Sequence, residues 1–358
     1  NNAVKRDLSI MIPAALEEGI PLMIGTAGGC GARPHVELTV NIIREIAREQ
    51  HLHFKMAVID AEFEKDYIKA ELRKGNVTPL GPAPELTEES VDECIHIVGQ
   101  MGEEPYMKAL ETGAQVILAG RSYDPCEFSA LAISKGFPKA LAIHMGKILE
   151  CAAITALPGS GSDCMLGTLR KDSFVVEPLN PERKCTTLSV AAHSLYEKSN
   201  PYELPGPGGA IDLHKTTFTQ LSDSQVEVRG TEFVPTEDYY VKLEGVRRVG
   251  YRTISPAATH DPVMISQIDE VIRGVRNRVE DNFNMKDSRN TWLDFKVYGK
   301  KGVMHMFPET PESSSDELLI IIEAVAPTQE EANTLCSFAR STMLHYGYEG
   351  RISTAGNL

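Results

Sequence analysis

The sequence lacks several features that mark whole classes of protein. Its 358 residues contain no run of about 20 consecutive apolar residues, the length that a membrane-spanning helix requires. It has 36 Lys and Arg residues against 50 Asp and Glu residues, which gives a formal net charge of −14. A nucleic-acid or anionic-membrane surface needs clustered basic residues, so we expect neither nucleic acid nor membrane as a partner.

The cysteines form no C-x-x-C pair, and their number is odd. Scattered thiols in a chain of this length are typical of a reducing compartment, which predicts a cytoplasmic protein without disulfides. The spacing also gives no support for a cysteine metal site. The seven positions are Cys30, Cys94, Cys126, Cys151, Cys164, Cys185 and Cys336.

The rest of the composition is that of an ordinary globular protein. Hydrophobic residues make up 42% of the chain and charged residues 24%. A chain of this length favours two domains. It starts with Asn in a helix-like pattern, so we expect it to be part of a longer protein.

The first 155 residues alternate short apolar runs with amphipathic stretches. Alternation of this kind predicts right-handed βαβ units, so we expect a Rossmann-like, doubly wound α/β domain with a mostly parallel sheet over residues 1–155. The predicted strands are 20–24, 54–59 and 114–119, and the predicted helices are 4–18, 35–50, 62–74, 87–112 and 143–153.

The pattern changes beyond residue 155, where strands alternate apolar and polar positions. We expect an α+β domain over residues 156–358, with one face of its sheet covered by helices. The predicted strands include 174–177, 225–229, 239–244, 249–254, 292–298 and 318–323, and the predicted helices are 263–283 and 328–346. The Ser/Glu/Pro-rich stretch 308–316 is predicted to be a surface loop.

A glycine-rich turn, Gly25-Thr-Ala-Gly-Gly-Cys-Gly-Ala-Arg-Pro34, joins the first predicted strand to the next helix. Backbone N–H groups of such a turn can approach an anion, so Gly28 and Gly29 are candidate binding residues. Arg33 adds a bidentate donor for a carboxylate. The spacing is neither that of a dinucleotide loop nor that of a P-loop, and tight packing explains such glycines equally well.

Polar side chains also follow the other two predicted strands. Asp60 follows the second, and Arg121 and Asp124 follow the third. In open parallel sheets, ligands bind outside the carboxyl ends of the strands, so we expect these residues near the glycine-rich turn. Asp124 precedes a proline and could instead cap the next helix.

Within the predicted helix 143–153, His144, Lys147 and Cys151 share one face. A Lys beside a His on an apolar helix can act as a general base. The alternative is that His144 is a hydrogen-bonded core residue and that Lys147 only extends its ammonium to solvent. Cys151 is expected to be a small buried hydrophobe.

A loop of small residues, 159–163, follows this helix. Ser160 and Ser162 could close it over a substrate, or the loop could merely connect two elements.

Six motifs are spread over nearly the whole chain, and together they resemble the acyclic terpene utilisation (AtuA-like) family. The resemblance implies a role in the catabolism of branched acyclic terpenoids and related acids. The motifs are Gly25-Thr-Ala-Gly-Gly-Cys-Gly-Ala-Arg-Pro-His35, Ala119-Gly-Arg-Ser-Tyr-Asp124, His144-Met-Gly-Lys-Ile-Leu-Glu-Cys151, Ala192-His-Ser-Leu-Tyr-Glu197 with Asn200-Pro-Tyr202, Gly250-Tyr-Arg-Thr-Ile254 and Gly350-Arg-Ile-Ser-Thr-Ala-Gly-Asn357.

From the residues we expect a lyase, either a hydro-lyase or a carbon–carbon lyase, that acts on a branched carboxylic acid or its CoA thioester. The binding residues of this hypothesis are Gly28, Gly29, Arg33, Arg121, Ser160 and Ser162. Lys147, His144 and Asp124 are the candidate acids and bases. The sequence identifies no cofactor, but a divalent metal ion held by Asp60, Asp124 or Glu150 could stabilise an enolate.

Two alternatives remain open. The chain could be a non-catalytic or incomplete subunit of a multi-subunit catabolic enzyme. An acidic surface is compatible with this alternative. It could also be a nucleotide-dependent oxidoreductase, although the spacing of the glycines argues against this. Size and enzyme class favour a homo-oligomer, and a second subunit is compatible with the sequence.

Overall fold

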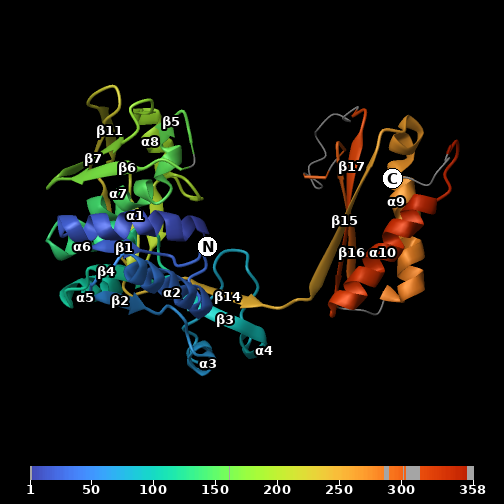
Figure 1. The fold of residues 1–358 in the computed structure, drawn as a ribbon, viewed down its shortest axis with the longest axis horizontal. Coiled ribbons are helices and arrows are strands. Elements are labelled where there is room, and N and C mark those ends of the chain that lie inside the picture. The colour runs from blue at the N-terminus through green and yellow to red at the C-terminus, as the bar shows by residue number, and fades with distance from the viewer. Residues whose placement is uncertain (1, 161, 286–289, 301, 304–314, 353–358) are drawn as a thin grey trace. The chain divides into compact units, whose positions relative to one another are not determined.

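A computed structural model describes residues 2–160, 162–285, 290–300, 302–303 and 315–352 of the chain (Figure 1). These residues form a mixed α/β protein in which most of the sheets are antiparallel. The chain divides into two compact units, Asn1–Arg247 and Arg248–Leu358. None of the helices that the structure describes is long and apolar enough to cross a membrane.

A three-stranded parallel sheet lies in the first unit. Its strands are β1 (Leu22–Ile24), β4 (Val116–Ala119) and β2 (Met56–Ile59), in the order β1-β4-β2. All three fall within the apolar runs that the sequence predicts as strands. The central strand β4 is buried at every position because it has a neighbour on each side and helices on both faces.

Successive residues of β4 point to opposite faces of the sheet, and each face has its own helices. Val116 and Leu118 pack against α1 (Asn2–Glu18) and α2 (Arg33–Glu49). Ile117 and Ala119 pack against α5 (Glu104–Glu111), α6 (Cys126–Ser134) and α7 (Lys139–Leu149). The unit therefore has the three layers of an α/β domain, but its parallel sheet is smaller than the sequence predicts.

The prediction of a single helix over residues 87–112 is wrong in the middle of this range. The structure has α4 (Glu88–Glu93), the strand β3 (Cys94–Gly99) and then α5, while α3 (Lys65–Arg73) lies within its predicted range. β3 pairs antiparallel with β14 (Leu243–Arg247), a strand from far along the chain. This pairing, which no local pattern reveals, overrides the helical spacing of the segment.

The first unit continues past residue 155, where the sequence predicts a boundary. Ile143 of α7 packs in the core beside the parallel sheet, whereas Leu141, Met145 and Ile148 pack against the strands that follow. One helix thus joins both cores and keeps residues 156–247 in the same unit. The strands of this part are β5 (Ala156–Leu157), β6 (Met165–Leu169), β7 (Ser173–Pro178), β8 (Lys184–Cys185), β9 (Glu203–Gly206), β10 (Gly209–Asp212), β11 (Thr217–Gln220), β12 (Val226–Arg229) and β13 (Glu232–Pro235), with α8 (Thr187–Ser194) among them.

The second unit is an α+β sandwich of two layers. Its antiparallel sheet has the order β15-β17-β16, formed by Tyr251–Thr259, Leu318–Ala326 and Trp292–Tyr298. Alternate residues of β16 and β17 pack on the apolar faces of α9 (Pro262–Phe283) and α10 (Gln329–His345). The elements agree with the predicted order, whereas residues 308–314 of the predicted surface loop 308–316 and residues 353–358 lie outside the described residues.

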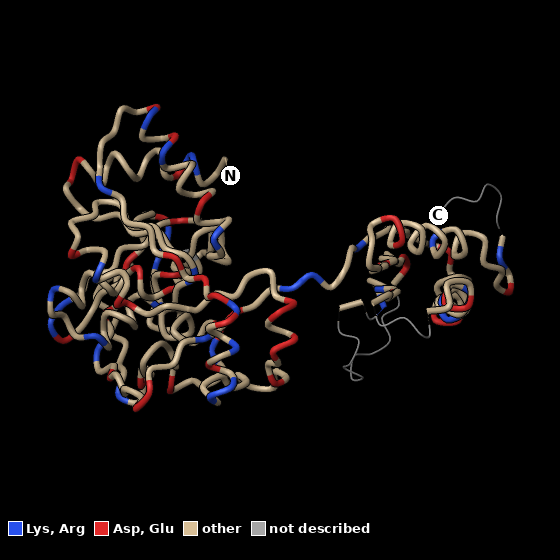
Figure 2. Tube along the Cα trace, turned by 90° about the horizontal axis from the view of Figure 1, so that it is seen from below, with Lys and Arg blue, Asp and Glu red and all other residues tan. Residues whose placement is uncertain are grey.

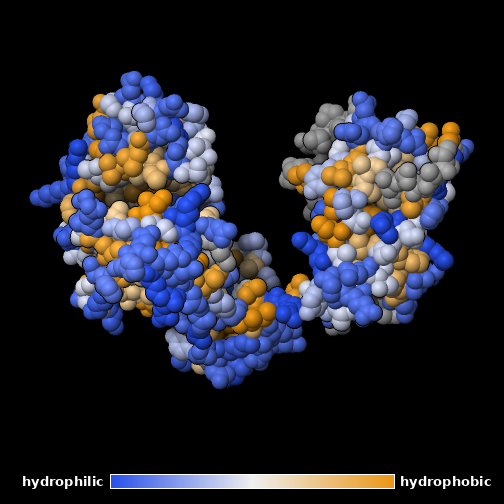
Figure 3. All heavy atoms as spheres, viewed as in Figure 1, coloured by the Kyte–Doolittle hydropathy of each residue, from blue (hydrophilic) through white to orange (hydrophobic). Residues whose placement is uncertain are grey.

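Charged residues of both signs are mixed along the chain. Figure 2 shows Lys and Arg interspersed with Asp and Glu in both units. On the face drawn in Figure 3, hydrophobic residues lie in small groups among hydrophilic ones. Mixed surfaces of this kind are typical of solvated proteins.

Candidate functional site

A groove of about 470 Å³ lies in the first unit. Its lining comes from β1 and the glycine-rich turn after it, from the segment between β4 and α6, from α6 itself and from the residues that follow α7. Apolar and ionisable side chains both border it. The lining residues are Pro21, Met23, Gly25, Thr26, Gly29, Arg121, Asp124, Glu127, Phe128, Leu131, Glu150 and Cys151.

Arg121, Asp124 and Thr26 form a polar cluster on the wall of this groove. The Thr26 hydroxyl donates to Asp124 Oδ1 at 3.1 Å, and Arg121 Nη1 lies 3.3 Å from Thr26 Oγ1 and 3.4 Å from Asp124 Oδ1. The guanidinium also faces Glu244 of β14, whose Oε2 is 3.0 Å from Nε. Arg121 is thus held between two carboxylates, with one edge on the groove.

Glycine is needed at different positions of the turn for different structural reasons. Gly31 has φ = 66°, and a Cβ there would lie 2.0 Å from the Arg121 backbone nitrogen, so close packing requires glycine. Gly28 has φ = 61°, and a Cβ there would meet the His35 side chain. Gly29 has φ = 81° with open space around it, and it borders the groove. Of the predicted pair Gly28 and Gly29, only Gly29 lines the site.

Glu127 is the functional candidate that the sequence reasoning missed. Its Oε2 is buried and has no hydrogen-bond partner in the described part of the chain. Burial raises the pKa of this carboxyl to about 8, and the nearby carboxylates of Asp124 and Glu150 act in the same direction. A Cβ at Gly25 would lie 2.5 Å from Glu127 Oε1, so the glycine leaves room for this group.

A signal for Glu127 was present in the sequence. It is the single charged residue in the apolar segment Cys126–Ser134, which forms α6. A carboxylate alone on such a helix is often buried and can have a shifted pKa.

Other buried polar atoms near Glu127 also lack partners among the described residues. They are Tyr123 Oη and Ser129 Oγ, on the same stretch of chain. Most buried polar groups in folded proteins form hydrogen bonds. Of these three groups only Glu127 borders the groove, where a polar molecule could give it a hydrogen bond.

Lys147 and Glu150 form a buried ion pair beside the groove. Lys147 Nζ contacts Glu150 Oε1 and lies 5.4 Å from the centre of the Tyr196 ring. Burial raises the pKa of Glu150, against the opposing effect of Lys147. Glu150 borders the groove, whereas Lys147 does not. The structure thus places Lys147 as the counter-charge of a groove residue.

Cys151 differs from its prediction, whereas His144 agrees with one of its two, that of a hydrogen-bonded core residue. Cys151 is exposed and borders the groove, so its prediction as a buried hydrophobe is wrong. His144 is fully buried, its Nδ1 lies 2.7 Å from Thr231 Oγ1, and its Nε2 lies 2.9 Å from Ser194 Oγ. Burial lowers its pKa to about 3. With both nitrogens bonded, His144 is a neutral core residue, and the geometry gives no support to a catalytic role.

Arg33 does not join Arg121 at the groove. Its Nε and Nη2 lie 3.2 and 3.1 Å from Asp60 Oδ2, and its backbone N–H donates to Glu62 at 2.9 Å. Arg33 and Asp60 line a different hollow, beside α2. The predicted clamp of Arg33 and Arg121 on one carboxylate is therefore not formed.

The remaining predicted residues lie elsewhere. Ser160 and Ser162 are exposed, and Ser160 Oγ accepts hydrogen bonds from the backbone of Ser162 and Asp163 at 3.3 and 3.2 Å. Ser160 thus stabilises its own loop, and neither serine lines the groove.

The predicted metal ligands are also separated. Asp124 and Glu150 border the groove, but Asp60 is bound to Arg33. Within the described ranges, no group of three or more His, Cys, Asp or Glu side chains is arranged to hold a metal ion. Of the three predicted ligands, only Asp124 and Glu150 therefore share the groove.

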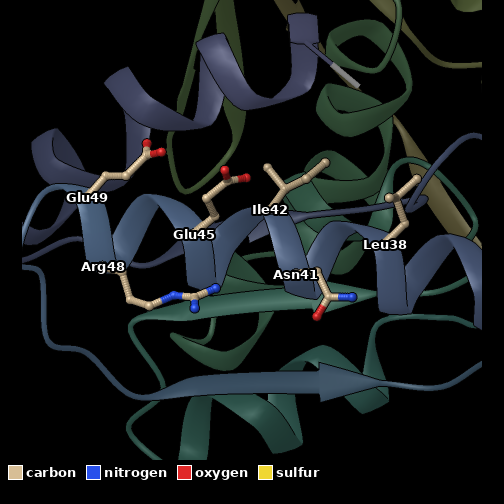
Figure 4. Close-up of a pocket in the computed structure, with 6 residues that line it drawn as sticks. All are labelled: Leu38, Asn41, Ile42, Glu45, Arg48 and Glu49. Atoms are coloured by element: carbon tan, nitrogen blue, oxygen red, sulfur yellow. The ribbon is translucent and has the colours of Figure 1, made fainter.

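A larger hollow of about 630 Å³ lies along α2 (Figure 4). All six labelled residues come from this one helix, and Asn41 and Arg48 point away from Glu45 and Glu49. The two glutamates are ion-paired with Lys5 of α1 at 3.1 and 2.7 Å. The lining of this hollow comes from one helix, and both of its glutamates already have a cation as partner. The groove beside Glu127 is therefore the better candidate site.

Comparison with known proteins supports the resemblance carried by the six motifs. No curated protein and no solved structure matches the chain. The family model described as acyclic terpene utilisation family protein AtuA matches residues 1–156 and 172–355. The matched ranges contain nearly the whole chain, with the groove and most of the motif residues. The chain therefore belongs to the AtuA family of acyclic terpene utilisation proteins.

Proposed function

We propose that the groove is the active site of a hydro-lyase that acts on a branched acyclic acyl-CoA thioester. Family membership supplies the role in acyclic terpene utilisation. The observation that carries the proposal is Glu127, a carboxyl group with a pKa of about 8 and an unpaired buried oxygen. Such a group still holds its proton at neutral pH and can donate it to a leaving hydroxyl.

The lining of the groove suits a branched hydrocarbon chain. Pro21, Met23, Phe128 and Leu131 offer apolar surface next to the ionisable residues. A ligand with a hydrocarbon body and one polar end would bury its body there and place its polar end near Arg121.

The charges of the groove favour a thioester over a free acid. Arg121 already faces the carboxylates of Asp124 and Glu244, and Glu150 is paired with Lys147. A free carboxylate would add one more negative charge to this set. A thioester carbonyl is neutral and needs only a hydrogen-bond donor, which Arg121 can provide.

The proposed reaction needs one acid and one base. The Asp124 carboxylate accepts the proton from the carbon next to the carbonyl, and Arg121 stabilises the negative charge that develops on the carbonyl oxygen. Glu127 then gives its proton to the hydroxyl on the next carbon, and the C–O bond breaks. The products are an α,β-unsaturated thioester and water. Lys147 acts indirectly, because it neutralises Glu150 at the edge of the groove.

The test replaces Glu127 with Gln, which keeps the shape of the protonated acid but cannot give up a proton. Branched 3-hydroxyacyl-CoA thioesters are incubated with the full chain, and the loss of water is followed by mass spectrometry. We expect Glu127→Gln to reduce kcat by roughly 10²- to 10⁴-fold, which is the usual contribution of a general acid. The matched control is Glu111→Gln, on the exposed end of α5.

Three results would contradict the proposal. Unchanged turnover by Glu127→Gln would remove Glu127 from the chemistry. Cleavage of a carbon–carbon bond would identify the other type of lyase. Turnover that requires a second polypeptide would support the incomplete-subunit alternative.

A further inference from the structure

We propose that Cys30 is a nucleophilic thiol with His35 as its base, and that it forms covalent adducts with α,β-unsaturated carbonyl compounds. The two residues lie on the outer side of the glycine-rich turn and do not line the groove. The proposal rests on their own geometry and is independent of the proposed lyase activity.

The geometry is that of a nucleophile beside a base. Cys30 Sγ lies 2.9 Å from His35 Nδ1, within hydrogen-bond distance. Cys30 is exposed to solvent, so a small molecule can reach the sulfur. A thiol becomes a strong nucleophile when an adjacent imidazole takes its proton. This is the combination of contact and access that a reactive cysteine requires.

The histidine is held at its backbone and on one side of its ring. A Cβ at Gly28 would lie 2.7 Å from His35 Cβ and Cγ, so the glycine backbone packs directly against the ring. The His35 backbone is fixed by its N–H bond to Ala32 O at 2.9 Å and by the Thr39 hydroxyl on its carbonyl, also at 2.9 Å. The His35 backbone is therefore fixed, and its ring packs on one side against Gly28.

The proposed step is an addition without a leaving group. The Cys30 sulfur forms a bond to the β-carbon of the unsaturated carbonyl compound, and the carbon–carbon double bond becomes a single bond. The thiol proton passes through His35 to the α-carbon. The adduct is a thioether, and no oxidant or reductant is needed.

The other cysteines provide internal references. Cys151 and Cys164 are also exposed, but Cys151 has a pKa raised by burial and by the Glu150 carboxylate. The remaining cysteines, Cys94, Cys126, Cys185 and Cys336, are buried. A reagent can therefore reach three cysteines: Cys30, Cys151 and Cys164. Cys30 is distinguished from the other two by its sulfur, which lies 2.9 Å from a histidine nitrogen.

The test uses N-ethylmaleimide as the unsaturated carbonyl probe, added to the full chain at less than one equivalent. Peptide mass spectrometry then gives the share of label on each cysteine. We expect Cys30 to carry most of the label and to react roughly tenfold faster than Cys164, because His35 can take the thiol proton during the addition. His35→Asn, which can accept the S–H bond but not the proton, should remove this advantage.

His35→Phe provides a second variant, because it keeps a ring against Gly28 and removes both nitrogens. The absence of label on the buried cysteines Cys94, Cys126, Cys185 and Cys336 shows in the same sample that the fold is retained. Equal labelling of Cys30 and Cys164 in the wild type would overturn the proposal. So would preferential labelling of Cys30 that survives in both His35 variants.

Discussion

Replacement of Glu127 by Gln should change how stability depends on pH. The folded chain holds the Glu127 proton up to a pKa of about 8, whereas an unfolded chain releases it near the usual value of 4.5. Below 4.5 both states are protonated, and above 8 both are ionised. Between these values only the unfolded chain gains by ionising, so wild-type stability falls as pH rises.

The magnitude follows from the gap between the two pKa values. The whole gap corresponds to a loss of at most about 5 kcal/mol in the free energy of unfolding. Roughly 3 kcal/mol of this loss falls between pH 5 and pH 8. Water that enters the groove will reduce this figure. Glu127→Gln has no proton to release, so it should become more stable than the wild type by about this amount as pH rises from 5 to 8.

The assay must report on the first unit. Trp292 is the single tryptophan and lies in the second unit, so its fluorescence follows the other part of the chain. Hydrogen exchange of β4 peptides over a urea series, measured at pH 5, 6, 7 and 8, gives the local free energy of unfolding. Glu111→Gln is the exposed control, and its local free energy of unfolding should change with pH as that of the wild type does. If the free energy of Glu127→Gln also changes with pH as in the wild type, Glu127 ionises at an ordinary pH and cannot be the proton donor.

Three further substitutions test the surrounding structure by chemical denaturation. His144, with a pKa of about 3 instead of 6.5, stays neutral only in the folded chain, so His144→Gln should gain roughly 4 kcal/mol of stability relative to the wild type as pH falls from 7 to 3.5. Lys147→Met should destabilise the first unit by about 3 kcal/mol because it leaves Glu150 buried without its partner, and adding Glu150→Gln should restore most of the loss. Gly31→Ala should cost about 3 kcal/mol through its left-handed φ and its clash with the Arg121 backbone. A variant whose denaturant midpoint equals that of the wild type under the stated conditions would refute the role given to that residue.

The sequence predicted elements whose pattern is local. The run 35–50 became α2, and 292–298 became β16, because regular apolar spacing selects one face of a helix or strand. The segment 94–99 was mispredicted because its partner β14 lies far along the chain. Antiparallel pairing of distant strands leaves no mark on either segment alone.

The site was predicted less well than the fold. Arg121 and Asp124 border the candidate groove, as expected for residues that follow a strand of a parallel sheet. Glu127 was missed because its burial depends on the space left by Gly25 and on neighbours from other elements. Arg33 was misplaced because Asp60, from the next strand, binds its guanidinium. Residue types reveal which groups can do chemistry, but three-dimensional neighbours decide which of them are free to do so.

The position of α7 between two cores has a consequence for how the protein unfolds. Ile143 on one side and Ile148 on another belong to separate apolar clusters, so loss of either cluster removes support from the same helix. The parallel sheet and the β-rich part should therefore melt together in one cooperative transition. A fragment that ends at residue 155 would expose the Leu141, Met145 and Ile148 surface and should aggregate, whereas a fragment that ends at Arg247 keeps the helix covered.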